Sequence, residues 1–98
     1  FAVIPTARFA DWIEGLKDRR AAARIAIRIV RIEAGNFGDA KSVGGKVSEP
    51  RMTMVPARVY FTIKGEEIIN LLCGGNKKSQ RRDIEQAYRM AEEIHRGT

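Results

Sequence analysis

The sequence is poor in the residues that build disulfides and metal sites. Its 98 residues include one cysteine, Cys73, and one histidine, His95. A single cysteine excludes an internal disulfide framework and is typical of a protein from a reducing compartment. One cysteine and one histidine also cannot supply the ligand set of a closed zinc site. We therefore expect a protein that binds no metal and needs no cofactor.

Long apolar runs are absent as well. No run approaches the roughly 20 residues that a membrane-spanning helix needs. The short apolar segment at 1–5 is soon followed by the charged residues Arg8 and Asp11, which argues against a signal peptide. These absences predict a cytoplasmic protein.

Familiar nucleotide and nuclease motifs are also missing. The dinucleotide-binding fingerprint does not occur, and the segment CGGNKKSQ at 73–80 lacks the spacing of a phosphate-binding loop. Two-metal nucleases need clustered carboxylates. Here Glu66 and Glu67 adjoin a predicted hairpin, and the later acidic residues are spread along one predicted helix. The sequence therefore argues against nucleoside triphosphate hydrolysis and metal-dependent nuclease chemistry.

Positive charge is what the sequence has in excess. Eighteen lysine and arginine residues against twelve aspartate and glutamate residues give a formal net charge of +6. Such a surplus favours a polyanionic partner such as nucleic acid or an acidic surface, without choosing among them. With 44% hydrophobic residues, the chain suits a single domain over residues 1–98 with one modest core.

Hydrophobic periodicity and turn residues predict the secondary structure. The predicted elements are a strand at 1–5, helices at about 7–17 and 19–35, strands at 47–55, 57–64 and 66–73, and a helix at about 79–95. Thr6 and Asp18 are suitable helix N-caps, and Gly35 suits a helix C-terminus. The glycine-rich segment 35–47 is expected to be a loop. The order β-α-α-β-β-β-α predicts an α+β fold in which an N-terminal helical hairpin packs on a small antiparallel sheet, with a C-terminal helix packed back onto it.

The strand patterns predict which positions are buried. Apolar residues alternate with polar ones along 57–64, so this strand is expected to be half-buried, with Arg58 and Tyr60 on its open face. Pro50 cannot donate a hydrogen bond within a sheet, which predicts that the strand at 47–55 lies at an edge or is bulged.

Cationic residues are concentrated in the loop, on the strands and after the last strand. This set comprises Lys41, Lys46, Arg51, Arg58, Lys77, Lys78, Arg81 and Arg82, and it is accompanied by Tyr60 and Gln80. Guanidinium and ammonium groups suit phosphate, and a tyrosine can stack on a base or donate a proton. RNA cleavage by its own 2′-hydroxyl needs a held phosphate, neutralised charge and proton transfer, which such side chains supply without a metal. The glycines at 74 and 75 are expected to turn the chain so that Lys77 faces Arg58 and Arg51.

A second group of cations lies on the helix at 19–35. Arg24, Arg28 and Arg31 form a stripe that is either an ordinary polar helix face or a surface for an acidic or amphipathic partner. Taken alone, composition and spacing predict a basic α+β domain that binds a phosphate-rich partner.

Several stretches, in this order, resemble the RelE/ParE superfamily of bacterial toxins, specifically its HigB-like addiction-module killer proteins. They are FADWIEGLKDRRAAARIAIRIVRIEAGNFGDAKSVGGKVSE at 9–49, RVYF at 58–61 and LLCGGNKKSQRRDIEQA at 71–87. The resemblance covers nearly the whole chain. It implies a RelE-like toxin of a type II toxin–antitoxin system. Such a toxin is a ribosome-dependent mRNA endoribonuclease, or mRNA interferase, that inhibits translation and is neutralised by a cognate antitoxin, often a HigA-like helix-turn-helix protein.

The resemblance also implies a site on the sheet. By the motifs SEPR, RVYF and GGNKKSQ, the catalytic residues would be Arg51, Arg58 and Lys77, with Tyr60 as a stacking or acid candidate. Arg58 would hold the scissile phosphate, Arg51 or Lys46 would favour the attacking 2′-oxygen, and Lys77 would neutralise the leaving side. Further RNA contacts are expected from Lys41, Lys46, Lys78, Gln80, Arg81 and Arg82, and antitoxin contacts from Arg24, Arg28 and Arg31.

Two departures from the family pattern bear on activity. The family usually reads ELR and GPGYRVYF, whereas this chain has Pro50 in place of the leucine and Ala57 where a Gly-Tyr pair is expected. These departures leave open a catalytically inactive protein that binds RNA or a partner. A ParE-like toxin that inhibits DNA gyrase is a further alternative, because it would have the same fold.

Overall fold

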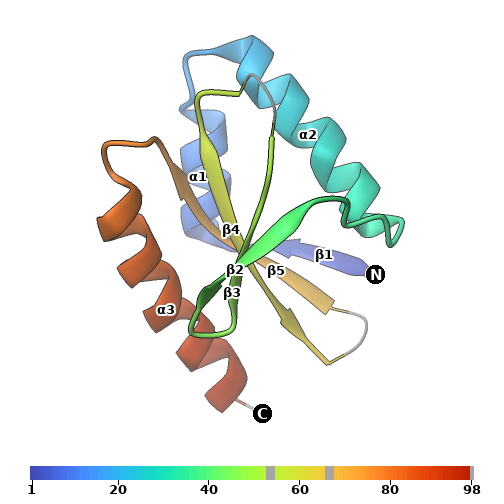
Figure 1. The fold of residues 1–98 in the computed structure, drawn as a ribbon, viewed down its shortest axis with the longest axis vertical. Helices are drawn as coiled ribbons and strands as arrows, with labels where there is room; N and C mark the ends of the chain where they lie inside the picture. The colour runs from blue at the N-terminus through green and yellow to red at the C-terminus, as the bar shows by residue number, and fades with distance from the viewer. Residues whose placement is uncertain (53–54, 66–67, 98) are drawn as a thin grey trace.

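Residues 1–52, 55–65 and 68–97 are described by the computed structural model of the chain, and they form a five-stranded sheet with three helices (Figure 1). In chain order the elements are β1 (Ala2–Pro5), α1 (Ala7–Glu14), α2 (Arg19–Glu33), β2 (Ala40–Gly44), β3 (Val47–Pro50), β4 (Arg58–Lys64), β5 (Ile68–Gly75) and α3 (Gln80–Arg96). The predicted α+β class is confirmed.

Local sequence signals set the ends of the first two helices. The Phe9 N–H donates a hydrogen bond to Thr6 Oγ1 at 3.2 Å, so Thr6 caps α1 as predicted. The Asp18 carboxylate caps α2 in the same way. The chain leaves α2 through Gly35, whose φ of 88° is a left-handed conformation that glycine adopts without strain.

The sheet is mixed, with strand order β1-β5-β4-β3-β2. Neighbouring strands are antiparallel except for β1, which runs parallel to β5 with Ala2 opposite Ile68. The prediction of a wholly antiparallel sheet is therefore wrong at this edge. Because β1 and β5 are joined through all the intervening elements, no tight turn imposes an antiparallel direction on them. Thr6 Oγ1 donates to the Leu72 carbonyl at 2.7 Å and anchors the end of β1 beside β5.

The segment expected to be a loop at 35–47 contains a further strand. β2 forms an antiparallel hairpin with β3, in which Lys41 lies opposite Glu49. β3 has β2 on one side and β4 on the other and ends at Pro50, so the prediction of an edge or bulged strand is wrong. The missing N–H of the proline falls where the strand stops. Of the predicted strand at 47–55, residues 53–54 lie outside the described residues.

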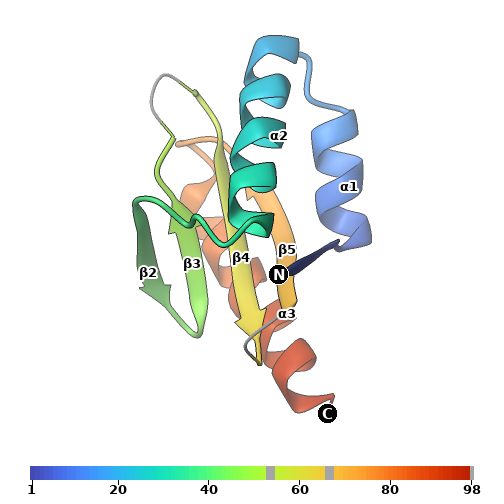
Figure 2. The ribbon, with the colours of Figure 1, turned by 90° about the vertical axis from the view of Figure 1, so that its right-hand side faces the viewer.

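Helices cover both faces of the sheet (Figure 2). α1 and α2 pack on one face in a cluster that includes Ile25 and Phe61, and α3 packs on the other in a cluster that includes Tyr60 and Ala87. Residues 59–62 of β4 are consequently all buried. The prediction of a half-buried strand here is wrong, because α3 covers the face that the alternating pattern left open.

Candidate functional site

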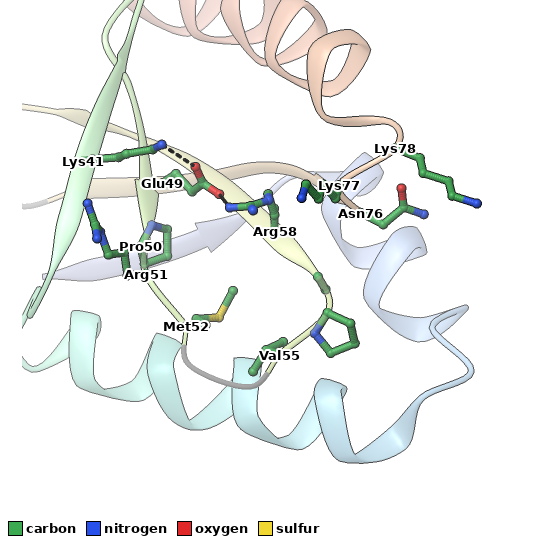
Figure 3. A pocket seen from close by; sticks show the side chains of 12 residues that line it. Lys41, Glu49, Pro50, Arg51, Met52, Val55, Arg58, Asn76, Lys77 and Lys78 are labelled. Carbon is green, nitrogen blue, oxygen red and sulfur yellow. Dashed lines mark hydrogen bonds and ion pairs between the residues drawn. The ribbon is translucent and has the colours of Figure 1, made fainter.

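A hollow of about 840 Å³ lies at the end of the sheet where β3 ends, β4 begins and β5 ends (Figure 3). It is lined by Lys41, Glu49, Pro50, Arg51, Met52, Val55, Pro56, Ala57, Arg58, Asn76, Lys77 and Lys78. Strand direction explains this gathering. β4 starts with Arg58 opposite Gly75, the last residue of β5, so residues that follow β3 and β5 come to the same end of the sheet. Five predicted cations meet here.

A buried carboxylate lies beneath these cations. Glu49, on β3, is 3% exposed, and its Oε2 accepts a hydrogen bond from Arg58 Nη1 at 2.9 Å. Its Oε1 lies 4.0 Å from Lys41 Nζ and has no hydrogen-bond partner within the described residues. Glu49 therefore holds one cation from β4 and one from β2. Sequence reasoning did not select Glu49, although the alternating pattern placed it on the same strand face as Val47, which is buried.

The Arg58 side chain is fixed at one point and open elsewhere. It is 38% exposed, and Nη1 is the atom that bonds to Glu49. A guanidinium presents several N–H donors in one plane, and two of them together match the geometry of a phosphate. Arg58 is thus held by Glu49 at one guanidinium nitrogen, while its partly exposed side chain lines the hollow.

Arg51 lies in the segment after β3, where it is attached to the loop that precedes β2. Its Nε lies 3.3 Å from the Asp39 carboxylate, and its N–H donates to the Asp39 carbonyl at 2.7 Å. Arg28 of α2 holds the same loop, because its guanidinium donates to the carbonyl oxygens of Asn36, Phe37 and Asp39. Arg28 therefore positions Arg51 through this loop and does not stand in an open stripe with its helical neighbours.

Lys77 and Lys78 lie in the short connection between β5 and α3. Figure 3 shows Lys77 beside Arg58, whereas the Lys78 side chain extends outward at the rim. Both precede the N-terminus of α3, where unpaired backbone N–H groups favour an anion. The expected meeting of Lys77, Arg58 and Arg51 around one hollow is confirmed.

Tyr60 is buried inside the protein and does not line the hollow. Its exposed fraction is 0%, and its hydroxyl has no hydrogen-bond partner in the described part of the chain. Burial, followed by the negative charges of Glu49 and Asp83, raises the pKa of Tyr60 far above its ordinary value. Because Tyr60 is fully buried, its ring cannot stack on a base and its hydroxyl cannot reach a leaving group. The prediction of a catalytic Tyr60 is therefore wrong.

Lys46 lies at the other end of the sheet. It belongs to the β2–β3 turn, has a φ of 62°, and lines a separate hollow with His95. Because β3 runs from this turn to the site, its length separates Lys46 from Arg51. The prediction that Lys46 assists the attacking oxygen is wrong.

The predicted RNA-binding residues of α3 lie beside the site. Gln80 begins α3 and does not line the hollow, and Arg81 and Arg82 line a neighbouring hollow of about 550 Å³. The side chain of Arg81 is 95% exposed, with its Nε 3.9 Å from Glu85. On α2, Arg24 and Arg31 are exposed side chains, and their role in partner binding stays a prediction.

The described residues also bear on metal binding, on the reactivity of the Cys73 thiol and on membrane spanning. Within residues 1–52, 55–65 and 68–97, no group of three or more histidine, cysteine, aspartate or glutamate side chains is placed to hold a metal ion. Burial raises the pKa of the Cys73 thiol to about 11, and Cys73 packs as a small apolar residue. No helix over the described residues is long and apolar enough to cross a membrane.

Comparison with known sequences relates the chain to a bacterial protein. Over 90 residues the chain is 42% identical to a protein of Haemophilus influenzae described as an uncharacterized protein. The match covers 91% of each of the two chains. No known family profile matches the chain.

Proposed function

We propose that the protein is the toxin of a type II toxin–antitoxin system and that it cleaves messenger RNA on the ribosome. The chain belongs to one family with the Haemophilus influenzae protein, which is described as uncharacterized. The observation that carries the proposal is the hollow that Lys41, Arg51, Arg58 and Lys77 line together with the buried Glu49, whose carboxylate pairs with Arg58 and Lys41. The resemblance of the sequence to RelE-like and HigB-like toxins supports the same proposal.

In the proposed reaction the 2′-oxygen of the RNA attacks the adjacent phosphorus and the 5′-oxygen leaves. Arg58, held by Glu49, binds the scissile phosphate and stabilises the charge that grows on its oxygens. The 2′-hydroxyl releases its proton to water as its oxygen attacks, and Arg51 and Lys41 stabilise the charge on that oxygen. The Lys77 ammonium donates a proton to the leaving 5′-oxygen. These residues require no metal, and the products carry a 2′,3′-cyclic phosphate and a 5′-hydroxyl.

The proposal includes a cytoplasmic location and a cognate antitoxin, for which a HigA-like helix-turn-helix protein is the expected partner. The exposed side chains of Arg24 and Arg31 on α2 suit an acidic or amphipathic segment of that antitoxin. A neighbouring gene for a small helix-turn-helix protein would support this part of the proposal.

A second candidate function is RNA binding without cleavage. The observation that favours it is the burial of Tyr60, because no neutral proton donor with an ordinary pKa then stands among the predicted catalytic residues. In this case the hollow would hold RNA phosphates through its cations, and binding would weaken steeply with salt.

The deciding experiment is cleavage of a translated message in a reconstituted translation reaction. New 5′-hydroxyl ends are labelled directly by polynucleotide kinase and mapped, with a parallel reaction in which initiation is blocked. We expect ends only on translated message, and loss of at least about 100-fold in rate for Arg58→Ala. Arg89→Ala is the matched control, because this exposed arginine of α3 does not line the hollow.

The alternatives give different results in the same preparation. Binding of RNA without new ends would favour the inactive RNA-binding protein. Inhibition of DNA gyrase in a supercoiling assay, with no RNA cleavage, would favour the ParE-like toxin. Wild-type cleavage by Arg58→Ala would overturn the assignment of the site.

A further inference from the structure

A further hollow, here called the Trp12 hollow, lies between α1 and α3. The candidate site described above is called the catalytic hollow. The Trp12 hollow has a volume of about 590 Å³, and Arg8, Asp11 and Trp12 of α1 line it together with Arg82 and Gln86 of α3. Its two arginines come from the two helices that border it. Asp83 of α3 lines it as well, so one aromatic ring, two cations, two carboxylates and an amide surround one space outside the proposed catalytic hollow.

Trp12 is fixed at the base of this hollow by the end of β5. A Cβ atom added at Gly74 would lie 2.4 Å from the benzo ring of Trp12, so the ring rests directly on the glycine backbone. The glycine at 74 was expected to turn the chain, but it is still within β5, paired with Val59, and what it provides is space for the indole. Trp12 is half-buried, its ring centroid lies 5.8 Å from that of Phe9, and its side chain lines the hollow.

The neighbouring hollow of about 550 Å³, already described with Arg81 and Arg82, connects these two. It shares Asn76 and Lys78 with the catalytic hollow and Arg82 with the Trp12 hollow. The three spaces therefore follow one another around the start of α3. Lys78, Arg81 and Arg82 supply positive charge along this path, which suits a phosphodiester backbone.

From this arrangement we propose that Trp12 and the arginines Arg8 and Arg82 form a base-stacking subsite for single-stranded RNA that extends from the catalytic hollow. The inference rests on the proposed function, because it takes RNA as the ligand. One base lies against the indole, the arginines hold its flanking phosphates, and Asp11 and Gln86 offer hydrogen-bonding groups to the polar edge of the base.

The subsite predicts a dependence on RNA length. A dinucleotide fills the catalytic hollow alone, whereas an oligomer of about eight nucleotides is long enough to reach the Trp12 hollow as well. Stacking of one base on an aromatic ring strengthens binding about tenfold or more. The longer oligomer therefore gains affinity that depends on Trp12 and Arg8, and the dinucleotide does not.

The experiment uses fully 2′-O-methylated single-stranded RNA, which binds but cannot be cleaved. Affinity is measured by fluorescence anisotropy of labelled oligomers, and stacking by quenching of tryptophan emission with unlabelled ones. Trp12 is the one tryptophan among the 98 residues, so the emission reports on this ring alone. We expect the eight-nucleotide oligomer to quench Trp12 emission with the same midpoint as its binding, and the dinucleotide to bind without quenching.

Two variants separate the subsite from general charge. Arg8→Ala and Trp12→Leu should weaken binding of the longer oligomer about tenfold and leave dinucleotide binding unchanged. Arg89→Ala is the matched control, because Arg89 is an exposed arginine of α3 that lines none of the three hollows. Arg8→Ala removes an exposed side chain, so it tests the subsite even if Trp12→Leu fails to fold.

The outcomes distinguish the inference from the function on which it rests. Binding of the longer oligomer with unchanged Trp12 emission, and with Arg8→Ala equal to Arg89→Ala, overturns the subsite and leaves the proposed nuclease standing. Absence of binding at both lengths, together with absence of cleavage on the ribosome, overturns both.

Discussion

Glu49 and Arg58 form an ion pair of 2.9 Å between adjacent strands, and the two side chains differ sharply in exposure: 4% for the glutamate and 38% for the arginine. The buried Glu49 carboxylate opposes stability, because its second oxygen lies 4.0 Å from Lys41 Nζ and accepts no hydrogen bond within the described residues, so its lost hydration is only partly replaced. The role of the pair is to position Arg58. The Glu49 carboxylate holds one nitrogen of the guanidinium, and the Arg58 side chain lines the hollow.

This relationship predicts that binding and cleavage respond differently to Glu49→Gln. The variant removes one negative charge beside the phosphate site, so RNA binding should be equal or tighter. Arg58 loses the partner that orients it, so single-turnover cleavage should fall by about tenfold or more. Anisotropy with 2′-O-methylated RNA and single-turnover kinetics measure the two quantities. Glu93→Gln is the control, because Glu93 is an exposed residue of α3 that lines none of the hollows on the proposed RNA path. Equal losses of binding and cleavage in Glu49→Gln would contradict a positioning role.

Tyr60 and Tyr88 make a matched pair for stability. The buried Tyr60 hydroxyl has no partner within the described residues, whereas the Tyr88 hydroxyl donates to the Val43 carbonyl. Tyr60→Phe should raise the free energy of unfolding by about 1 kcal/mol, and Tyr88→Phe should lower it by about 1 kcal/mol. Urea denaturation measures both. A folded Tyr60→Phe protein that had lost all cleavage would restore a catalytic role to this hydroxyl.

Arg28 and Arg31 lie on the same helix but have different surroundings. Arg28→Ala releases three loop carbonyls and should lower the free energy of unfolding by about 1–3 kcal/mol. Arg31→Ala should change it by less than about 1 kcal/mol, as expected for an exposed charge in the last turn of a helix. Hydrogen exchange of the Arg51 amide, which bonds to the Asp39 carbonyl, should accelerate in Arg28→Ala alone. Unchanged exchange there would show that Arg28 does not position Arg51.

His95 predicts a pH dependence of stability. Burial, and then the nearby charges of Lys46 and Lys64, lower the pKa of His95 below its ordinary value. Thr62 donates its hydroxyl proton to the Lys46 carbonyl at 2.7 Å, so it accepts at 2.9 Å from the N–H at Nε2 of His95, a bond that the neutral and the protonated ring both make. The unfolded chain therefore binds this proton more readily than the folded protein does.

The sign of the effect follows from linkage. The free energy of unfolding should fall as the pH drops below the ordinary histidine value of about 6.5, and level off below the lowered pKa of the folded state. Urea denaturation at several pH values measures the slope, and His95→Gln should flatten it in this window. A slope of the opposite sign would contradict a lowered pKa of His95 in the folded protein.

The sequence predicted features that depend on local chemistry. Thr6 and Asp18 cap their helices, and Gly35 carries the chain out of α2, because side-chain hydrogen bonds and left-handed backbone need only neighbouring residues. Arg58 and Lys77 were predicted to meet, and they do so because their segments adjoin the same end of the sheet.

Features that depend on distant packing were not predictable in the same way. The alternation in β4 left Tyr60 on an open face, and only the packing of α3 shows that this face is covered. Lys46 is close to Arg51 in sequence, yet the reversal of the chain at the β2–β3 turn puts it at the other end of β3. Glu49 gave a local signal, a charge at a buried strand position, but its partners come from two other strands.

The pairing of β1 with β5 also constrains the order in which the protein is completed during synthesis. Thr6 and Leu72, which are joined by a hydrogen bond, lie 66 residues apart in the chain. β1 leaves the ribosome well before β5 and has no strand to pair with until β5 has emerged, whereas α1 and α2 can form from local contacts. The cationic hollow needs the same late segment, since Asn76 and Lys77 follow β5 directly. The nascent chain therefore carries its arginines for most of its synthesis without the site that arranges them.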